Sequence, residues 1–143
     1  MLRAGRYRAL QEKELIDHPA LDNEYNSYCY VVTEGFYFKS ENGKEVIVPE
    51  GFLSDGATGF QDIGCGFIFH DWLYCVGVFA DNTHCSRMDA DKIMVEVARA
   101  EGYLIFSHMF YLLAIVNPFN LLDRGRKASH DRGPHFLPST THL

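Results

Sequence analysis

The sequence predicts an α+β fold in which an N-terminal β-hairpin or small antiparallel sheet is followed by three packed helices and an extended C-terminal arm. Three observations lead to this prediction. β-Branched and aromatic runs recur between residues 28 and 48, apolar residues follow helical spacing between residues 67 and 116, and the last stretch is polar with interspersed Gly and Pro. A length of 143 residues fits one ordinary domain. We therefore expect a single domain over residues 1–122 and an arm over residues 123–143.

The first elements are expected to be strands around a turn. Within residues 1–26 only the piece from Leu10 to Ile16 has helical spacing, which predicts at most one short helix. Strand-forming residues fill the ranges 28–33, 36–38 and 45–49. Asn42-Gly43 lies between two of these runs, and both residues accept the positive φ of a type I′ turn, so we expect a hairpin that ends at Pro49.

Three helices are expected after a glycine-rich loop of residues 49–59. The first covers residues 67–78. The second begins after Ser86, whose hydroxyl can cap it while Asp89 completes a capping box, and it ends near residue 102. The third, residues 103–116, is apolar on nearly all sides but shorter than the roughly 20 residues that cross a bilayer. We therefore expect a buried core helix and no transmembrane segment.

Composition and charge narrow the class of protein. Hydrophobic residues make up 47% of the chain and charged residues 22%, values typical of a globular domain. A formal net charge of −6 argues against nucleic acid as a partner, although Arg124, Arg126 and Lys127 are locally basic. The N-terminus is charged and lacks the apolar core of a signal peptide, so we expect the protein to be made in the cytoplasm.

The four cysteines, at positions 29, 65, 75 and 85, contain no CxxC pair. Reduced, buried thiols are the favoured interpretation, and a bridge between Cys75 and Cys85 is an open alternative. A zinc site built from His70, Cys75, His84 and Cys85 is the metal alternative, although its spacing differs from that of a zinc knuckle.

The strongest functional signal is the dipeptide His70-Asp71, which lies inside an apolar stretch from Ile63 to Phe79. Leaving a buried charge without its partner costs about 3–5 kcal/mol. A metal ion, a second acid or a hydrogen-bond network must therefore compensate these two side chains. Candidate acids are Asp55, in the glycine-rich loop, and Asp91, in the second predicted helix.

Helical spacing distinguishes Asp91 from Asp89. Asp91 shares an inward-facing stripe with Met94, Val95 and Ala98 at i+3, i+4 and i+7. We therefore expect Asp91 to hydrogen-bond to His70, the alternative being a residue at the rim of the core. Asp89 is better explained as a first-turn acid that interacts favourably with the helix dipole.

Four short motifs, in this order, resemble a largely phage and prophage family called DUF1353. They read Val48-Pro-Glu-Gly-Phe52, Ser54-Asp-Gly-Ala-Thr58, His70-Asp-Trp-Leu-Tyr74 and Arg87-Met-Asp-Ala-Asp91, and the resemblance covers about residues 28–116. Ser54 and Thr58 each replace the family's other hydroxyl residue, and Gly59 replaces a frequent proline. The resemblance implies a protein encoded by a phage.

The same order is similar, more distantly, to prokaryotic phospholipases A2, in which a His-Asp pair on one helix faces an aspartate on another. This similarity implies a phospholipase A2-like helical core and calcium-dependent hydrolysis of phospholipid esters. Carried over by position, His70 is the general base, Asp91 orients its imidazole, and calcium is held by Asp71, Asp55 and the carbonyl of Gly56. The loop between Asp55 and His70 is shorter than in those enzymes, and Leu73 and Cys75 replace the glycine and basic residue that often flank the helical tyrosine.

A second function class stays open beside the hydrolase. The chain could be a non-enzymatic structural or accessory virion protein that keeps the scaffold and enters the virion after synthesis in the host cytoplasm. In that case the arm of residues 123–143 would bind virion subunits. It has no periodic apolar stripe to offset its ordering entropy, so we expect it to be ordered only against another protein.

Overall fold

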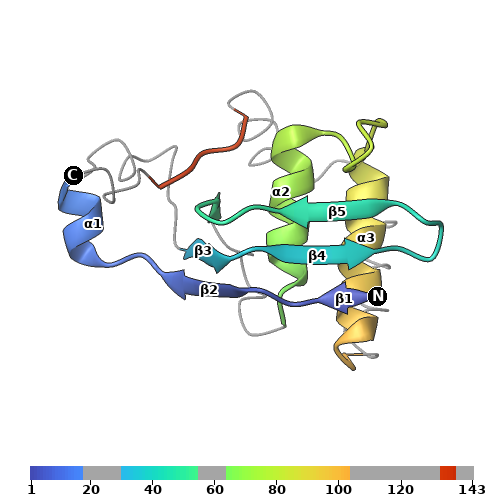
Figure 1. Cartoon of the computed structure of the whole chain (residues 1–143), viewed down its shortest axis with the longest axis horizontal. Helices are drawn as coiled ribbons and strands as arrows, with labels where there is room; N and C mark the ends of the chain where they lie inside the picture. The colour runs from blue at the N-terminus through green and yellow to red at the C-terminus, as the bar shows by residue number, and fades with distance from the viewer. Residues whose placement is uncertain (18–29, 55–63, 104–132, 138–143) are drawn as a thin grey trace.

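The computed structural model describes residues 1–17, 30–54, 64–103 and 133–137. The elements in chain order are β1 (Leu2–Arg3), β2 (Arg6–Ala9), α1 (Glu12–Asp17), β3 (Tyr30–Glu34), β4 (Phe36–Lys39), β5 (Glu45–Val48), β6 (Leu53–Ser54), α2 (Gly66–Val76) and α3 (Arg87–Ala100). Figure 1 shows the strands running along the long axis of the molecule, with α2 and α3 crossing behind β4 and β5.

The strands form two three-stranded antiparallel sheets, ordered β1-β4-β5 and β2-β3-β6. Two stretches of chain supply both sheets, because only Ala4-Gly5 separates β1 from β2 and only Gly35 separates β3 from β4. The two stretches touch backbone to backbone at this break. A Cβ atom at Gly5 would lie 2.0 Å from the carbonyl oxygen of Glu34, so glycine is required there.

The predicted hairpin is confirmed, but with a different turn. β4 pairs with β5 along the whole of both strands. In the connection, Gly43 has a φ of 85° and its N–H donates to the Ser40 carbonyl, whereas Asn42 is not among the described residues with positive φ. The turn is therefore a longer loop with one left-handed glycine, and not the two-residue type I′ turn that we expected.

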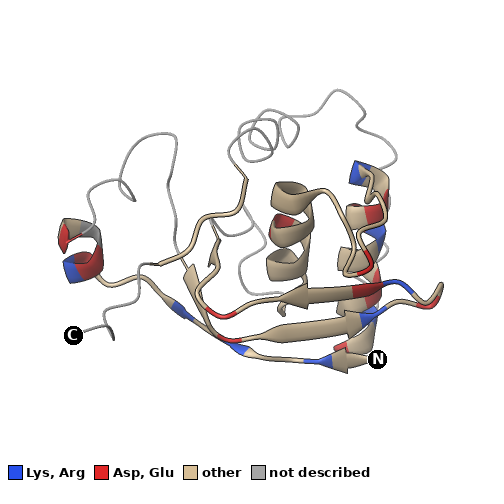
Figure 2. Ribbon diagram, turned by 45° about the horizontal axis from the view of Figure 1, so that its top comes forward, with Lys and Arg blue, Asp and Glu red and all other residues tan. Residues whose placement is uncertain are grey.

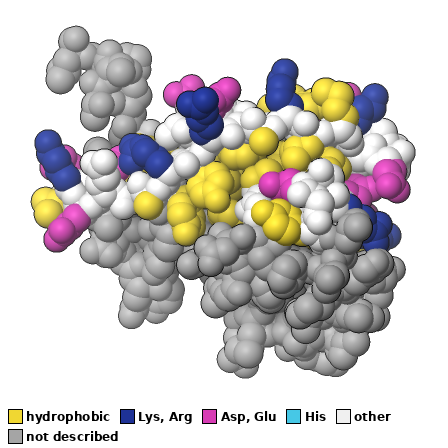
Figure 3. All heavy atoms as spheres, turned by 90° about the horizontal axis from the view of Figure 1, so that it is seen from below, with side chains coloured by type: hydrophobic (Ala, Val, Ile, Leu, Met, Phe, Trp, Pro, Cys, Tyr) yellow, Lys and Arg dark blue, Asp and Glu magenta, His cyan; other side chains and the backbone are white. Residues whose placement is uncertain are grey.

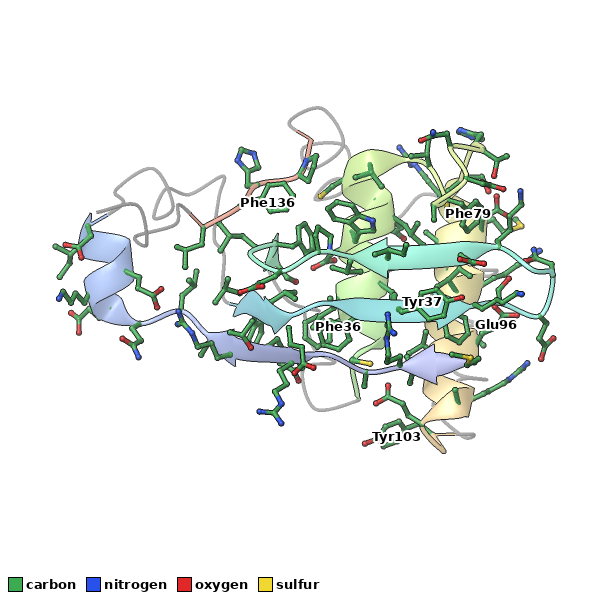
Figure 4. The ribbon with its side chains drawn as sticks, in the orientation of Figure 1. Phe36, Tyr37, Phe79, Glu96, Tyr103 and Phe136 are labelled. Carbon is green, nitrogen blue, oxygen red and sulfur yellow. The ribbon has the colours of Figure 1, made fainter. Side chains whose placement is uncertain are left out.

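The core lies between the β1-β4-β5 sheet and the two longer helices. Phe69 of α2 packs against Phe36 and Phe38 of β4, with ring centroids 5.8 and 6.0 Å apart. Figure 4 labels Phe36 and its neighbour Tyr37, which extend from opposite faces of β4 because side chains alternate along a strand. Phe36 is buried under the helices and Tyr37 is only half-buried, so one face of this sheet is covered.

The two longer helices lie close to their predicted positions. The capping box of α3 is confirmed, because the Asp89 N–H donates to Ser86 Oγ at 3.1 Å and the Ser86 N–H donates to Asp89 Oδ2 at 3.0 Å. At the start of α2 the N-cap residue, Cys65, makes no side-chain capping hydrogen bond. The N–H of Cys65 donates to Glu101 Oε1 at 2.9 Å, so a residue just past α3 caps α2. Among the described residues, no helix has the length and apolar character needed to cross a membrane.

The predicted arrangement of an N-terminal β-hairpin or small antiparallel sheet followed by three packed helices is wrong. The described residues form six strands in two three-stranded sheets, and of their helices only α2 and α3 are longer than six residues. The sequence does not reveal β1 and β2 because they lie at sheet edges, and all four side chains of β2 are exposed. A strand whose side chains are exposed on both faces needs no alternation of apolar and polar residues, so the sequence carries no strand signal at β2. The expected third helix, over residues 103–116, lies outside the described residues except for Tyr103.

The expectation that the arm is ordered only against another protein is wrong for residues 133–137. Phe136 forms an antiparallel bridge with Phe52 of the same chain. The remainder of the arm, residues 123–132 and 138–143, lies outside the described residues. At least one part of the C-terminal segment therefore belongs to the domain.

Replacing Ile68 by Ala should lower the free energy of unfolding by about 2–5 kcal/mol, because the side chain is 0% exposed and its removal leaves a cavity in the core. The same change at Ile47, which is 53% exposed on β5, is the matched control and should cost less than about 1 kcal/mol. Urea denaturation followed by circular dichroism measures both values. Equal losses would contradict the packing of α2 described above.

Candidate active site

The candidate site lies where α2 packs against α3 and β6. The start of α2 lies close to α3, because a Cβ atom at Gly66 would lie 3.2 Å from the Met94 carbonyl oxygen. α2 carries a single acidic residue, Asp71, which accounts for the one acidic segment coloured on this helix in Figure 2. Its polar pair, His70 and Asp71, therefore sits on an otherwise apolar helix between two neighbouring elements.

The structure brings His70 and Asp91 together, as predicted. Nε2 of His70 lies 2.8 Å from Oδ1 of Asp91 across the α2–α3 interface, which is hydrogen-bond distance. The side chains are 13% and 22% exposed, respectively. Asp89 is occupied in the capping box instead, so the helical spacing assigned the two aspartates correctly.

Tyr74 is a site residue that sequence reasoning missed. Its hydroxyl donates to Oδ1 of Asp91, the same oxygen that bonds to His70. The Tyr74 and His70 rings lie against each other, with centroids 3.6 Å apart. The available signal was spacing, because residues i and i+4 of a helix share one face and Tyr74 follows His70 by four.

Asp71 is anchored from the opposite side. Ser54 of β6, whose side chain is almost fully buried, donates from Oγ to Oδ2 of Asp71 at 2.5 Å. The other carboxylate oxygen, Oδ1, lies 3.9 Å from Nδ1 of His70, beyond hydrogen-bond range but close enough for electrostatic attraction. Ser54 was noted only as part of a motif, and its role depends on a tertiary contact that the sequence does not display.

The imidazole of His70 is placed between two carboxylates. Burial acts most strongly on its pKa and lowers it, but the combined effect of Asp71 and Asp91 is larger, and the pKa is raised above the ordinary value of 6.5. In the neutral form, a proton on Nε2 is held by Asp91, which leaves the lone pair of Nδ1 on the side of Asp71. A water molecule at Nδ1 could therefore transfer a proton to His70.

Of the side chains that the resemblance implies as calcium ligands, the described residues include only Asp71. Asp71 provides a carboxylate that is 16% exposed, with Ser54 beside it. Calcium takes six to eight oxygen ligands. Asp55 and Gly56, which the resemblance adds, lie outside the described residues, although Asp55 is joined directly to Ser54. The hard oxygen donor present fits calcium, and the remaining ligands stay a prediction.

The zinc alternative is wrong. His70, Cys75, His84 and Cys85 all belong to the part of the chain that the structure describes, and within that part no three His, Cys, Asp or Glu side chains form a group that could hold a metal ion. Cys75 and Cys85 are not joined by a disulfide, so the alternative bridge between them is not formed either.

Comparisons with protein-family models, with curated proteins and with solved structures found no match to this chain. The resemblances inferred from the motifs therefore stay predictions.

Stability should depend on pH through His70. A raised folded-state pKa means that the protonated imidazole stabilises the fold below pH 6.5, and that this stabilisation is lost as the pH rises through the raised value. Asp91→Asn removes one of the two carboxylates that hold the proton, so the loss above pH 6.5 should become smaller. Urea denaturation at a series of pH values from about 5 to about 9 measures the difference.

The matched control is Asp81→Asn. The pKa of Asp81 is lowered to about 2, first by the hydroxyl and N–H of Thr83 and then by Lys44. Its contribution is present above the ordinary value of 3.8 and is lost as the pH falls toward 2. Asp81→Asn should leave the pH dependence of stability above pH 6.5 as it is in the wild type. An Asp91→Asn protein with the same profile as wild type above pH 6.5 would contradict the assigned pair.

Proposed function

We propose that this protein is a hydrolase that uses His70 to activate water for attack on a lipid ester. The observation that carries the proposal is the position of the imidazole, with Nε2 bonded to Asp91 at 2.8 Å and Nδ1 directed to the side of the anchored Asp71. His70 and Asp71 of α2 and Asp91 of α3 thus lie side by side, where they would serve as the base, a ligand for a hard cation and the group that orients the base. The motif resemblance to phospholipases A2 supports the same chemistry.

The reaction begins when Nδ1 of neutral His70 takes a proton from water as the water oxygen attacks the ester carbonyl carbon. A new C–O bond forms and the carbonyl π electrons move to oxygen. Asp91 stabilises the imidazolium, because its carboxylate is bonded to the opposite nitrogen. When the tetrahedral intermediate collapses, the C–O bond to the alcohol breaks and the leaving oxygen takes the proton back from His70.

Calcium is the cofactor implied by the resemblance to phospholipases A2. Asp71 would hold it, together with Asp55 and the carbonyl of Gly56 from the adjoining loop. When bound, the cation would stabilise the negative charge that develops on the ester oxygen. Tyr74 would keep Asp91 in place through its hydroxyl, and thereby keep the imidazole oriented.

The surface offers support for a lipid substrate. Figure 3 shows a face on which hydrophobic side chains form a band, with both basic and acidic side chains along its border. Phospholipids present acyl chains, which such an apolar band could contact. We therefore favour phospholipid over a polar ester as the substrate class.

One observation favours the second candidate, a structural or accessory virion protein. The raised pKa of His70 keeps a larger fraction of the imidazole protonated near neutral pH, and a protonated imidazole cannot accept a proton from water. In a non-enzymatic protein, the buried Asp71–His70–Asp91 group would serve to fix the packing of α2 on α3. The partners would then be virion subunits and the location the virion.

The hydrolase proposal is tested with phosphatidylcholine in mixed micelles and millimolar calcium, measuring released fatty acid. His70→Asn should lower the rate on the order of 10²–10⁴-fold, because it removes the base. Asp81→Asn, at an exposed ion pair with Lys44, is the control and should retain wild-type activity. Wild-type protein that hydrolyses no faster than a folded His70→Asn protein would reject the hydrolase and favour the virion role.

Calcium should bind with a Kd between about 10⁻⁶ and 10⁻³ M, since few charged ligands are expected. Isothermal titration calorimetry measures this directly. Asp71→Asn should abolish the heat of binding, whereas Asp81→Asn should preserve it. Calcium binding of the same strength in the Asp71→Asn protein would remove Asp71 from the site.

A further inference from the structure

The C-terminal segment extends the β2-β3-β6 sheet at its β6 edge. The Leu53 N–H donates to the His135 carbonyl and the Leu137 N–H donates to the Gly51 carbonyl, both at 2.9 Å. Phe136 forms the bridge with Phe52 between these two bonds. Residues 135–137 therefore pair with residues 51–53 through one isolated antiparallel bridge and two hydrogen bonds, although more than eighty positions separate them in the chain.

The same segment contacts α2 through aromatic rings. Phe136, labelled in Figure 4, packs against Trp72 with centroids 6.2 Å apart and against Phe52 with centroids 6.4 Å apart. Phe52 and Trp72 pack edge-on at 5.2 Å. One cluster is thus formed by three aromatic rings, those of Phe52 just before β6, Trp72 of α2 and Phe136 of the C-terminal segment.

The C-terminal segment contacts Leu53 and Trp72, and each of these residues is next to one partner of the Ser54–Asp71 hydrogen bond. Leu53, which bonds to residue 135, directly precedes Ser54, and Trp72, which packs against Phe136, directly follows Asp71. Ser54 and Asp71 are themselves hydrogen-bonded at 2.5 Å. The C-terminal segment therefore holds both sides of the contact that anchors Asp71.

We propose that residues 133–137 are a positioning clamp for Asp71, holding β6 and α2 at the spacing that the Ser54–Asp71 hydrogen bond requires. The effect of the clamp on calcium and catalysis rests on the proposed function. Its effect on Asp71 itself does not.

Two features explain why β6 needs such support. β6 has two residues and pairs with β3 at two positions, and so short a strand is weakly held by its own ladder. A hydrogen bond weakens steeply once its geometry departs from the usual distance and angle. A small displacement of β6 from α2 would therefore free the Asp71 carboxylate to rotate.

The test uses the full-length chain with Phe136→Ala, which removes the ring that contacts Trp72. The first readout is the carbon-13 chemical shift of the Asp71 side-chain carboxyl group, and Ser54→Ala provides the reference for a lost anchor. The second is fluorescence of Trp72, the single tryptophan of the chain. Ile47→Ala is the control, because Ile47 is also a partly exposed hydrophobic residue, 53% against 46% for Phe136.

We expect Phe136→Ala to move the Asp71 carboxyl resonance in the same direction as Ser54→Ala and to shift Trp72 emission to longer wavelength. Phe136→Tyr keeps the aromatic ring, so both signals should stay at their wild-type values. Ile47→Ala should also change neither signal. In the Ser54→Ala background, Phe136→Ala should add no further change at Asp71, since both act on one hydrogen bond. If Phe136→Ala does not fold, Phe136→Leu takes its place.

An Asp71 resonance that stays at its wild-type position while Trp72 emission shifts would overturn the clamp and leave the segment a simple cover over the ring cluster. The spectroscopic readouts need neither calcium nor substrate. Absence of lipid hydrolysis in the wild type would therefore reject the proposed function alone, and a normal hydrolase with an unmoved Asp71 resonance would reject the clamp alone.

Discussion

Compensation of the two adjacent polar side chains of α2 is the constraint around which the rest of this molecule is organised. Successive residues of a helix point about 100° apart, so His70 and Asp71 cannot be satisfied from the same direction. One neighbour has to come from each side. α3 supplies Asp91 at one side and β6 supplies Ser54 at the other, while the remaining faces of α2 pack against the sheet. The position of α2 between a helix and a strand follows from this need as much as from burial of its apolar residues.

The features that could be predicted from the sequence were those with local signals. The capping box of α3 and the hairpin between β4 and β5 depend on residues close together in the chain, and the pairing of His70 with Asp91 followed from helical spacing on two well-defined helices. The N-terminal strands could not be predicted in the same way, because an exposed edge strand needs no apolar alternation. The role of Ser54 as the partner of Asp71 was missed for a different reason. Its partner lies on another element, and no local pattern encodes that contact.

The electrostatics of His70 place two demands in conflict. Two carboxylates beside one imidazole stabilise its protonated form, which helps a reaction that passes through an imidazolium and also fixes the buried packing. The same carboxylates reduce the fraction of neutral imidazole available as a base. A cation held by Asp71 would relieve the conflict, because its positive charge would oppose protonation of the neighbouring ring. The hydrolase and the virion interpretation therefore differ in whether Asp71 faces a cation or only the imidazole.

The two halves of the site are held with different rigidity. His70, Tyr74 and Asp91 lie on two packed helices, where side-chain positions are set by short-range contacts within the core. Asp71 lies on α2 as well, but its partner Ser54 belongs to a two-residue strand. Sites built on regular elements are held more closely than those that depend on short strands and loops. His70 and Asp91 are thus fixed by the packing of two helices, whereas the Asp71 carboxylate depends on how β6 is held against α2.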